Sequence, residues 1–286
     1  MIPLATILIP AWNEGTVIAR TLTCLQDGMA RGRLRIVVIA NACTDDTAAV
    51  ARRAAPVALV LETPLAGKCH AMNLGLAYAE PGATVVCLDA DLDVSAAGVL
   101  ALIEPLRNGT ALAACGRMDV DTTGASFLVR AWVRAWRLNP YFARGKFGGL
   151  FALSPMGVDR VFPLPALTAD DEWMRRAFAP GEVAFVPACT FTARAPRTLG
   201  ALIQTRRRSL RGARAITAMG RTAPQGEGPR AMLRAALPQP HLWFAMAVYV
   251  AVMVWVRLLL VTERPAAIPR WERDQTNRTP PTRTAG

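Results

Sequence analysis

Four short apolar runs alternate with helix-like segments along the N-terminal part of the chain. The runs are ATILIP, LRIVVIA, VALVLE and TVVCLDA, and their residues favour buried strands. Around them, residues 14–26, 45–54, 68–78 and 96–106 are expected to form short helices. This alternation predicts βαβ units, and therefore an α/β fold in which a mostly parallel sheet is flanked by helices.

Polar residues gather where three of the predicted strands end. These clusters cover residues 10–14, 41–46 and 89–93. In a parallel sheet the carboxyl ends of the strands meet at one edge, and ligands of such sheets bind there. The three clusters therefore predict a binding site at that edge.

Helix capping is an alternative explanation for two of the clusters. Thr44 is a good N-cap residue, with Asp45 and Asp46 in the positively polarised first turn after it. The turn at residues 10–14 is likewise compatible with capping by Asn13. We favour capping for Asp45.

Three carboxylates at alternate positions, Asp89, Asp91 and Asp93, follow an apolar run. Like charges this close repel one another unless a cation, hydrogen-bond donors or a helix N-terminus offset them. Ser95 is a good N-cap, so Asp93 is expected to neutralise the dipole of the helix that follows. Asp89 and Asp91 precede the cap, and a divalent cation shared with a phosphorylated ligand explains them more simply.

The positive charge of the chain suggests an anionic partner, and one long apolar run suggests that this partner is a membrane. The net charge is +12, and Lys68 and Lys146 are the only lysines among the basic residues. Residues 242–261 contain one charge, and a helix of that length spans about 30 Å, the thickness of a bilayer core. We therefore expect a membrane partner and no nucleic acid, and prefer a membrane helix to a long buried core helix.

The orientation of this helix stays open. The N-terminus lacks the basic region and the length of a signal peptide, and six cysteines without paired spacing indicate a reducing compartment. We expect the inner (cytoplasmic) membrane, with the catalytic domain facing the cytoplasm. A full span would export residues 263–286, whose arginines oppose export, so a membrane-embedded helix that does not cross is the alternative.

Several motifs resemble one enzyme family in both order and interval. They are ILIPAWNEGTVIARTL, IVVIANACTDDTAAVA, GKCHAMNLGLAYA and VVCLDADLD, followed by GGLFALS, LTADDEWMRRAF and QTRRRSLRG. Over roughly residues 4–215 the chain resembles family-2 glycosyltransferases with the GT-A fold. The resemblance implies inverting transfer of a sugar from a UDP- or GDP-sugar, with Mg²⁺ or Mn²⁺ bridging the diphosphate.

The same resemblance assigns roles on the donor side. Asp91 would bind the metal and Asp89 the donor, while Glu14 and Lys68 would lie in the nucleotide pocket. Asn41 stands where many relatives have an acid, so it accepts a hydrogen bond without balancing charge. The expected donor-binding residues are Pro10, Glu14, Asn41, Asp46, Lys68, Asp89, Gln204, Arg207 and Arg208.

On the acceptor side, Asp171 matches the general base of the family, with Asp170 beside it as a possible orienting group. A carboxylate within hydrogen-bond reach makes a hydroxyl acceptor nucleophilic by taking its proton. Capping of the helix that follows is the alternative for this pair. Gly148 and Gly149 indicate close backbone approach near the acceptor, although a β-bulge also favours glycine.

The motif QTRRR fits the family only in part. Gln204 and Arg207 agree with it, but Arg208 stands where processive synthases have Trp, which favours transfer of a single sugar. An amphipathic helix on anionic lipid is the alternative for these arginines, and the two roles are compatible. Trp132 and Trp136 share one helix face, and we favour a core or membrane contact over an acceptor platform.

We expect five segments and one activity. Residues 1–115 form the nucleotide-sugar-binding half and 116–200 the acceptor-binding half; 201–240 are a basic interfacial segment, 241–262 the membrane helix and 263–286 a disordered tail. The activity is metal-dependent transfer to a lipid or lipid-linked acceptor. The alternatives are a non-catalytic GT-A-like binding module and a nucleotidyltransferase; no G-x-G-x-x-G follows the first strand, which argues against a Rossmann dehydrogenase.

Overall fold

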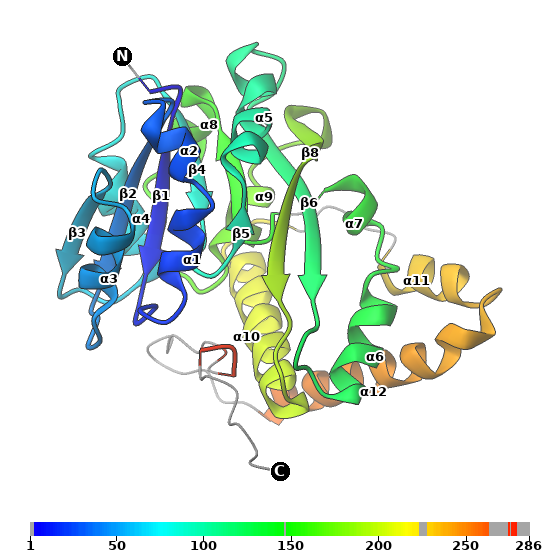
Figure 1. Cartoon of the computed structure of the whole chain (residues 1–286). Helices are drawn as coiled ribbons and strands as arrows, with labels where there is room; N and C mark the ends of the chain where they lie inside the picture. The colour runs from blue at the N-terminus through cyan, green and yellow to red at the C-terminus, as the bar shows by residue number, and fades with distance from the viewer. Residues whose placement is uncertain (1–2, 146, 223–227, 263–273, 275, 279–286) are drawn as a thin grey trace. The chain divides into compact units, whose positions relative to one another are not determined.

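The computed structural model describes residues 3–145, 147–222, 228–262, 274 and 276–278 (Figure 1). It divides into two compact units. Unit 1 comprises residues 1–119, 141–193 and 212–225, and unit 2 comprises residues 120–140, 194–211 and 226–286. Most of the predicted tail, residues 263–273, 275 and 279–286, lies outside the described residues. The five predicted segment boundaries stay predictions.

The strands form one sheet with the order β3-β2-β1-β4-β7-β6-β8-β5. Strands β1, β2, β3 and β4 are mutually parallel, whereas β7 runs antiparallel to both β4 and β6, and β5 antiparallel to β8. The predicted α/β class is confirmed, and the sheet is mixed because its second half adds antiparallel strands. The strands are β1 (Ala5–Ala11), β2 (Leu34–Asn41), β3 (Leu59–Thr63), β4 (Thr84–Leu88), β5 (Asp93–Val94), β6 (Ala113–Asp121), β7 (Leu150–Leu153) and β8 (Val183–Arg194).

Eight helices accompany the strands in unit 1 over the described residues. The helix predicted at residues 14–26 is two short ones, because the chain turns at Cys24 and Leu25. The helices are α1 (Ile18–Thr23), α2 (Gln26–Ala30), α3 (Thr47–Ala54), α4 (Lys68–Leu76), α5 (Ala96–Arg107), α7 (Tyr141–Arg144), α8 (Pro155–Val161) and α9 (Asp170–Arg175).

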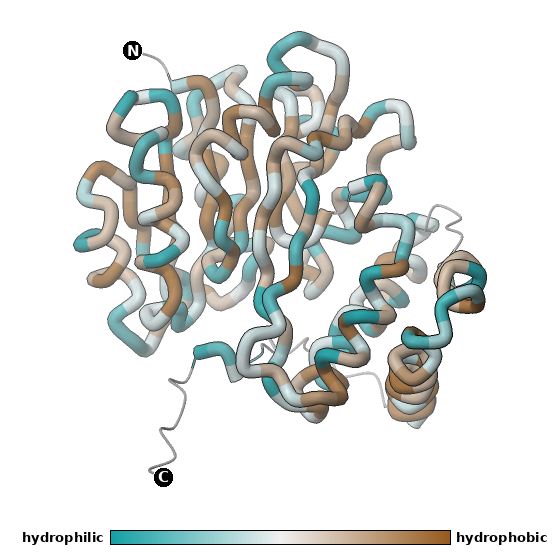
Figure 2. The backbone as a smooth tube through the Cα atoms, turned by 45° about the vertical axis from the view of Figure 1, so that its right-hand side comes forward, coloured by the Kyte–Doolittle hydropathy of each residue, from teal (hydrophilic) through white to brown (hydrophobic). Residues whose placement is uncertain are grey.

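Alternate strand residues point to opposite faces of the sheet, so each parallel strand contributes to two apolar layers. Leu8, Val37 and Cys87 pack on one face with α4, α8 and α9. Ile7 and Val38, one position removed, are equally buried and belong to the opposite face. Hydrophobic colour accordingly follows the strands in Figure 2. The near-continuous apolar runs of the sequence are explained by burial on both sides.

Unit 2 is helical. It contains α6 (Phe127–Trp136), α11 (Gly228–Ala236), α12 (Trp243–Thr262) and the first part of α10 (Leu199–Ala218), whose end belongs to unit 1. Ser126 begins α6 by accepting a hydrogen bond from the Val129 amide. Small and apolar residues of α6, α11 and α12 form a shared core that includes Ala135, Met232 and Ala245. Within the described part of the chain, one segment, Pro240–Thr262, is long and apolar enough to cross a membrane.

Candidate active site

The candidate site lies at the carboxyl ends of β1 and β4. The chain passes from β1 outward to β2 and β3 and then returns to the other side of β1 as β4. The edge between β1 and β4 is therefore the topological switch point, where ligands of open α/β sheets bind. Pro10 lies near the end of β1, and Asp89 directly follows β4.

A lysine joins two carboxylates at this edge. The Lys68 ammonium lies 2.6 Å from Asp89 Oδ1 and 2.8 Å from Asp170 Oδ2. The Lys68 and Asp170 side chains are 12% and 6% exposed, whereas Asp89 is 35% exposed. Burial lowers the pKa of Lys68, but the two carboxylates outweigh it and raise the pKa well above its ordinary value. Lys68 is therefore a fixed cation between α9 and the end of β4.

The Asp89 carboxylate has the opposite tendency. Partial burial raises its pKa, Lys68 lowers it, and the charges of Asp170 and Asp91 raise it again, which leaves it above its ordinary value. An accumulation of negative charge thus surrounds one lysine. Such an environment favours the arrival of a further cation.

Gly149 fixes the position of Asp89. Its backbone has a φ of 85°, which favours glycine, and its carbonyl accepts a hydrogen bond of 2.8 Å from the Asp89 amide. A Cβ atom at Gly149 would lie 2.5 Å from Asp89 Oδ2. The predicted close backbone approach is present here, directed at Asp89; an acceptor contact of Gly148 and Gly149 stays a prediction.

Asn41 connects the ends of β1 and β2 with the start of α4 through its buried side chain. Its amide nitrogen donates to the Ala11 carbonyl at 2.8 Å, and its oxygen accepts from the Gly67 amide at 3.1 Å. Gly67 is the residue before Lys68 and begins α4 with a φ of 135°. Asn41 thereby positions the lysine, which the sequence did not indicate; its predicted donor contact stays a prediction.

The capping expected at Thr44 is wrong. Asn13, with a φ of 53°, accepts hydrogen bonds at Oδ1 from the amides of Thr44 and Asp45, at 2.6 and 3.3 Å. Asp45 in turn accepts from the amide of Thr47, the first residue of α3. Long-range pairing with Asn13 therefore replaces a cap by Thr44, whereas Asp45, for which capping was favoured, provides a local hydrogen bond at the start of α3.

Two further predicted donor residues border this loop pair. Glu14 is buried, and its amide donates to the Thr47 hydroxyl at 2.7 Å. Asp46 is the N-cap residue of α3 without a capping side-chain bond, and its exposed carboxylate lies 3.7 Å from Arg53. Both lie at the carboxyl edge of the sheet, and their donor contacts stay predictions.

The role expected for Asp93 is also wrong. Ser95 caps α5 as predicted, accepting from the Gly98 amide at 3.0 Å, but Asp93 lies in β5 and pairs with Arg20 at 2.6 Å. Arg20 also donates to the Asp91 carbonyl at 3.1 Å. Arg20 therefore holds the loop that presents Asp91, which is the predicted metal ligand.

Helix α9 presents the adjacent pair Asp170 and Asp171. Its N-cap residue is Ala169, so neither carboxylate is the N-cap considered as the alternative. Asp170 is buried against Lys68. Asp171 is half-buried, and its Oδ1 accepts from the Glu172 amide at 2.8 Å. One carboxylate is thus committed to an ion pair while its neighbour is more accessible.

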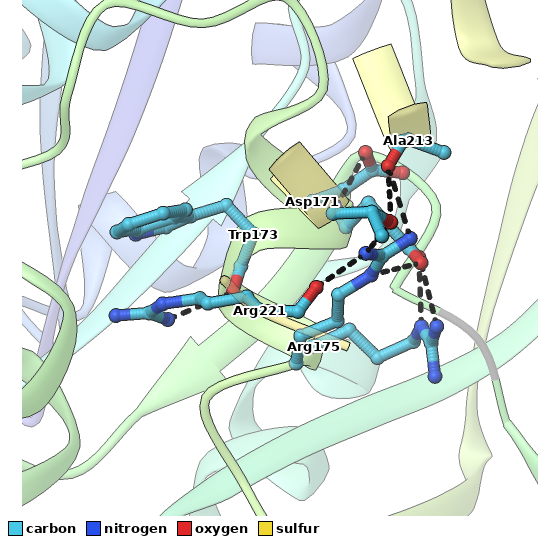
Figure 3. A network of polar contacts seen from close by, with 8 residues as sticks. Asp171, Trp173, Arg175, Ala213 and Arg221 are labelled. Atoms are coloured by element: carbon cyan, nitrogen blue, oxygen red, sulfur yellow. Dashed lines mark hydrogen bonds and ion pairs between the residues drawn. The ribbon is translucent and has the colours of Figure 1, made fainter. Parts of the chain in front are cut away.

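A network of polar contacts connects α9 to residues 213–221 (Figure 3). Glu172 accepts from Arg175 at 2.7 and 2.8 Å and from Arg176 at 2.7 Å. Arg176 is 3% exposed and also donates to the Thr217 hydroxyl and to the Arg221 carbonyl. The network ties α9 to the end of α10 within unit 1, and holds the Asp170–Asp171 pair in place.

Arg221 closes the same network against an aromatic ring. Its guanidinium carbon lies 3.6 Å from the centroid of Trp173, and it donates to the Trp173 carbonyl at 3.2 Å (Figure 3). Sequence reasoning missed Arg175, Arg176 and Arg221. Only the spacing of Glu172 from Arg175 and Arg176, at i+3 and i+4 on a helix, could have indicated part of this set.

The Glu172 cluster predicts a pH-dependent contribution to stability. Burial raises the pKa of Glu172, but its bonds to Arg175 and Arg176 lower the pKa by more than burial raises it. The folded-state pKa therefore lies below the ordinary 4.5. A lowered pKa stabilises the fold above pH 4.5, and the gain disappears as pH falls through the folded value. We expect Glu172→Gln to lower the free energy of unfolding by about 2 kcal/mol at pH 7.

Urea unfolding at several pH values tests this expectation. The difference between the wild type and Glu172→Gln should shrink steadily below pH 4.5. Glu62→Gln is the matched control, because Glu62 pairs with Arg52 while both side chains are more than half exposed. A difference that is constant with pH would show that Arg175 and Arg176 do not stabilise the ionised form.

The remaining predicted residues belong to unit 2. Gln204, Arg207 and Arg208 lie on the part of α10 in that unit, and their donor contacts stay predictions. Trp132 is 1% exposed; its ring lies 5.1 Å from that of Trp136, and Arg206 covers both rings at 5.4 and 5.0 Å. The favoured core role of Trp132 is therefore confirmed.

The carboxylates fit a divalent cation that is shared with a ligand. No group of three His, Cys, Asp or Glu residues suited to hold a metal occurs among the described residues. Mg²⁺ is usually bound by one or two carboxylates together with substrate phosphates, so a complete protein cage is unnecessary. Asp89 and Asp91 provide hard oxygen ligands close enough for the charge of Asp91 to raise the pKa of Asp89.

Comparison with known proteins assigns the family. The model of glycosyl transferase family 2 matches residues 6–156, more than half of the 286 residues. The chain belongs to glycosyl transferase family 2. It is a glycosyltransferase, and the expected family and enzyme class are confirmed. The matched region includes both strand ends of the switch point together with Lys68, Asp89 and Asp91.

Solved structures support the GT-A fold of this family 2 chain. A mannosyltransferase from Pyrobaculum calidifontis, in complex with GDP-Man and Mn²⁺, is 22% identical with a TM-score of 0.57, over 92% of this chain and 79% of that one. A glucosyl-3-phosphoglycerate synthase from Mycobacterium tuberculosis, in complex with Mn²⁺, UDP-Glc and phosphoglyceric acid, is 20% identical with a TM-score of 0.55, over 77% and 81%. No curated protein matches the chain.

Proposed function

We propose that this glycosyltransferase transfers a single sugar, with inversion, from a UDP- or GDP-sugar to a lipid or lipid-linked acceptor at a membrane. The observation that carries the proposal is Lys68 held between Asp89 and Asp170, beside the half-buried Asp171. In this proposal Asp89 is the donor-side acid, Lys68 the fixed cation and Asp171 the base. The similar structures bind GDP-Man or UDP-Glc, which supports a nucleotide-sugar donor.

Asp170 and Asp171 of α9 have different roles in the reaction. Asp171 takes the proton from the acceptor hydroxyl as its oxygen attacks the anomeric carbon, because a neutral hydroxyl is a weak nucleophile. Asp170 is buried and paired with Lys68, so it orients the lysine and leaves the proton transfer to Asp171. The nucleoside diphosphate departs with the electron pair of the broken glycosidic bond.

The donor side stabilises the charge of the leaving group. Lys68 is a permanently charged donor that contacts Asp89 before the ligand arrives, and a nearby diphosphate would share it. Asp91, with Asp89, would hold a bound Mg²⁺ or Mn²⁺. When bound, that ion offsets the developing diphosphate charge as a Lewis acid. Arg20 keeps the Asp91 loop in place through its bond to the Asp91 carbonyl.

Calorimetry with nucleoside diphosphates tests the donor side. We expect the full chain to bind UDP or GDP more tightly with Mn²⁺ than without it, and Asp91→Ala to remove this difference. Asp159→Ala is the matched control, because Asp159 is an exposed acid of α8 outside the site. Binding of a nucleotide that is equally tight in Asp91→Ala and wild type would contradict the metal role of Asp91.

One apolar segment of unit 2 and the positive charge of the chain support a membrane location of the acceptor. The chain has a segment long and apolar enough to span a bilayer, and its net charge is +12. A lipid-phosphate acceptor would be concentrated by such a surface. We accordingly place the enzyme at the inner membrane with its catalytic domain toward the cytoplasm. Retention of the activity with a water-soluble acceptor but not with a lipid-linked one would contradict this location.

A further inference from the structure

The apolar helix α12 has two different faces. One stripe packs inside unit 2 and includes Ala245, Val252 and Val256, each at most 6% exposed. The other side is open to solvent and equally apolar: Trp243, Trp255 and Leu258 are 57%, 53% and 55% exposed. A helix that only completed a soluble core would bury its apolar side and expose a polar one. Exposure of this apolar face of α12 to water is therefore unfavourable.

Helix α6 runs alongside α12 in the same direction. The rings of Phe127 and Phe244 are 5.5 Å apart, and those of Trp132 and Tyr249, five positions further along each helix, are 5.3 Å apart. Insertion of α12 across a bilayer would thus either strip α6 from it or carry α6 into the hydrocarbon. Helix α6 has the exposed arginines Arg130 and Arg134, whose burial in lipid is unfavourable.

Two described residues near the C-terminus, Thr276 and Asn277, bind to the chain just after β8. The Arg197 amide donates to the Thr276 hydroxyl at 2.9 Å, and the Asn277 side chain donates to the Ala195 carbonyl at 2.9 Å. Ala195 follows β8 directly in the chain. If α12 crossed the bilayer, Thr276 and Asn277 would be on the side opposite to Ala195. The observed hydrogen bonds can form only when both ends of α12 lie on the same side of the bilayer.

The charged residues of the three described helices around the apolar face are all arginines. Helices α6, α11 and α12 together contain five arginines and no acidic residue. On α11 the exposed Leu233 lies three positions after Arg230, and the exposed Leu237, which directly follows the helix, lies three positions after Arg234. Apolar and aromatic residues bordered by arginines are typical of helices that lie in the interface of an anionic membrane.

We propose that unit 2 docks on one leaflet of an anionic bilayer, with α12 in the plane of the membrane and its exposed face in the headgroup–acyl boundary. The docking face is defined by Phe127, Leu233, Trp243, Phe244, Trp255 and Leu258. The inference deepens the proposed function, since it rests on the membrane location given there. It also keeps the arginine-rich tail on the same side as the catalytic unit, which removes the conflict with the positive-inside rule.

Vesicle flotation of the full chain tests the docking face. We expect binding to equimolar phosphatidylcholine and phosphatidylglycerol to be at least about tenfold tighter than to phosphatidylcholine alone. The double substitution Trp255→Glu and Leu258→Glu should lower binding to the anionic vesicles by at least about tenfold without lowering the thermal midpoint. Met156→Glu is the control, because Met156 is 67% exposed on α8 in unit 1.

Trypsin treatment of sealed inverted membrane vesicles tests the in-plane orientation. The tail contains natural cleavage sites after Arg270, Arg273, Arg278 and Arg283. We expect tail peptides and unit 1 peptides to be released together without detergent. Tail peptides that appear only after detergent would overturn the in-plane helix.

Two further outcomes keep the docking and the enzymatic proposals separate. If the double variant floats like the wild type and instead dissociates a dimer in light scattering, the face is a contact between copies and the docking proposal fails. Nucleotide binding is measured without vesicles. Loss of flotation with intact UDP or GDP binding concerns docking alone, and the absence of nucleotide binding in a protein that floats contradicts the proposed donor alone.

Discussion

Asp171→Asn is expected to bind the nucleotide donor normally and to lose transfer by about 10²- to 10⁴-fold, the usual contribution of a general base. The substitution is structurally mild. Asp171 Oδ1 accepts a hydrogen bond from the Glu172 amide at 2.8 Å, and the side-chain oxygen of Asn accepts the same bond. The change therefore removes the basic oxygen pair and leaves the start of α9 intact.

Two measurements on one preparation check this expectation: calorimetric affinity for the nucleoside diphosphate, and single-turnover transfer from the nucleotide sugar. Asp159→Asn is the matched control, because Asp159 is an exposed acid on α8. If Asp171→Asn loses donor affinity in proportion to transfer, the division between a donor side and a base on α9 is wrong. Asp170→Asn should differ from it, since the Asp170 side chain is buried and paired with Lys68.

The parallel half of the fold was predictable from the sequence because burial on both faces leaves a clear pattern. Strands β1, β2 and β4 are mostly apolar, and all of their residues except Arg35 are buried. Polar residues after such runs then define the carboxyl edge of the sheet. The family motifs and the position of the candidate site followed from these local features.

The interactions within the site were less predictable, because they join residues that are distant in sequence. Local rules predicted that Asp93 neutralises a helix dipole and that Thr44 is a helix cap. The structure instead pairs Asp93 with Arg20 of α1, and the Thr44 amide with Asn13 of the loop after β1. Neither partner has a sequence signal, since a single arginine or asparagine in a turn has many possible roles. The pairing of Lys68 with Asp170 likewise depends on how α4 and α9 pack on the same face of the sheet.

Because Lys68 pairs with the buried Asp170, removal of the lysine charge is expected to lower the stability of the fold. Lys68→Met removes the ammonium and retains the apolar stem, so Asp170 stays buried beside Asp89 with no cation between them. Loss of one partner of a buried ion pair costs about 3 kcal/mol or more, because a charge is left uncompensated. For a chain of this size that corresponds to a fall in the thermal midpoint of roughly 6 to 12 °C.

A second substitution distinguishes this mechanism from a general packing defect. In Lys68→Met with Asp170→Asn the uncompensated charge is gone, so we expect a large part of the lost thermal midpoint to return, as measured by calorimetry at neutral pH. Arg52→Met is the matched control: it also removes one cation from an ion pair, but Arg52 and Glu62 are 52% and 59% exposed, and exposed pairs contribute less than about 1 kcal/mol. A double variant less stable than Lys68→Met would mean that Asp170 stabilises the fold through contacts other than Lys68. Recovery would instead identify Lys68 as the cation that makes a buried acid on α9 compatible with an acid at the end of β4.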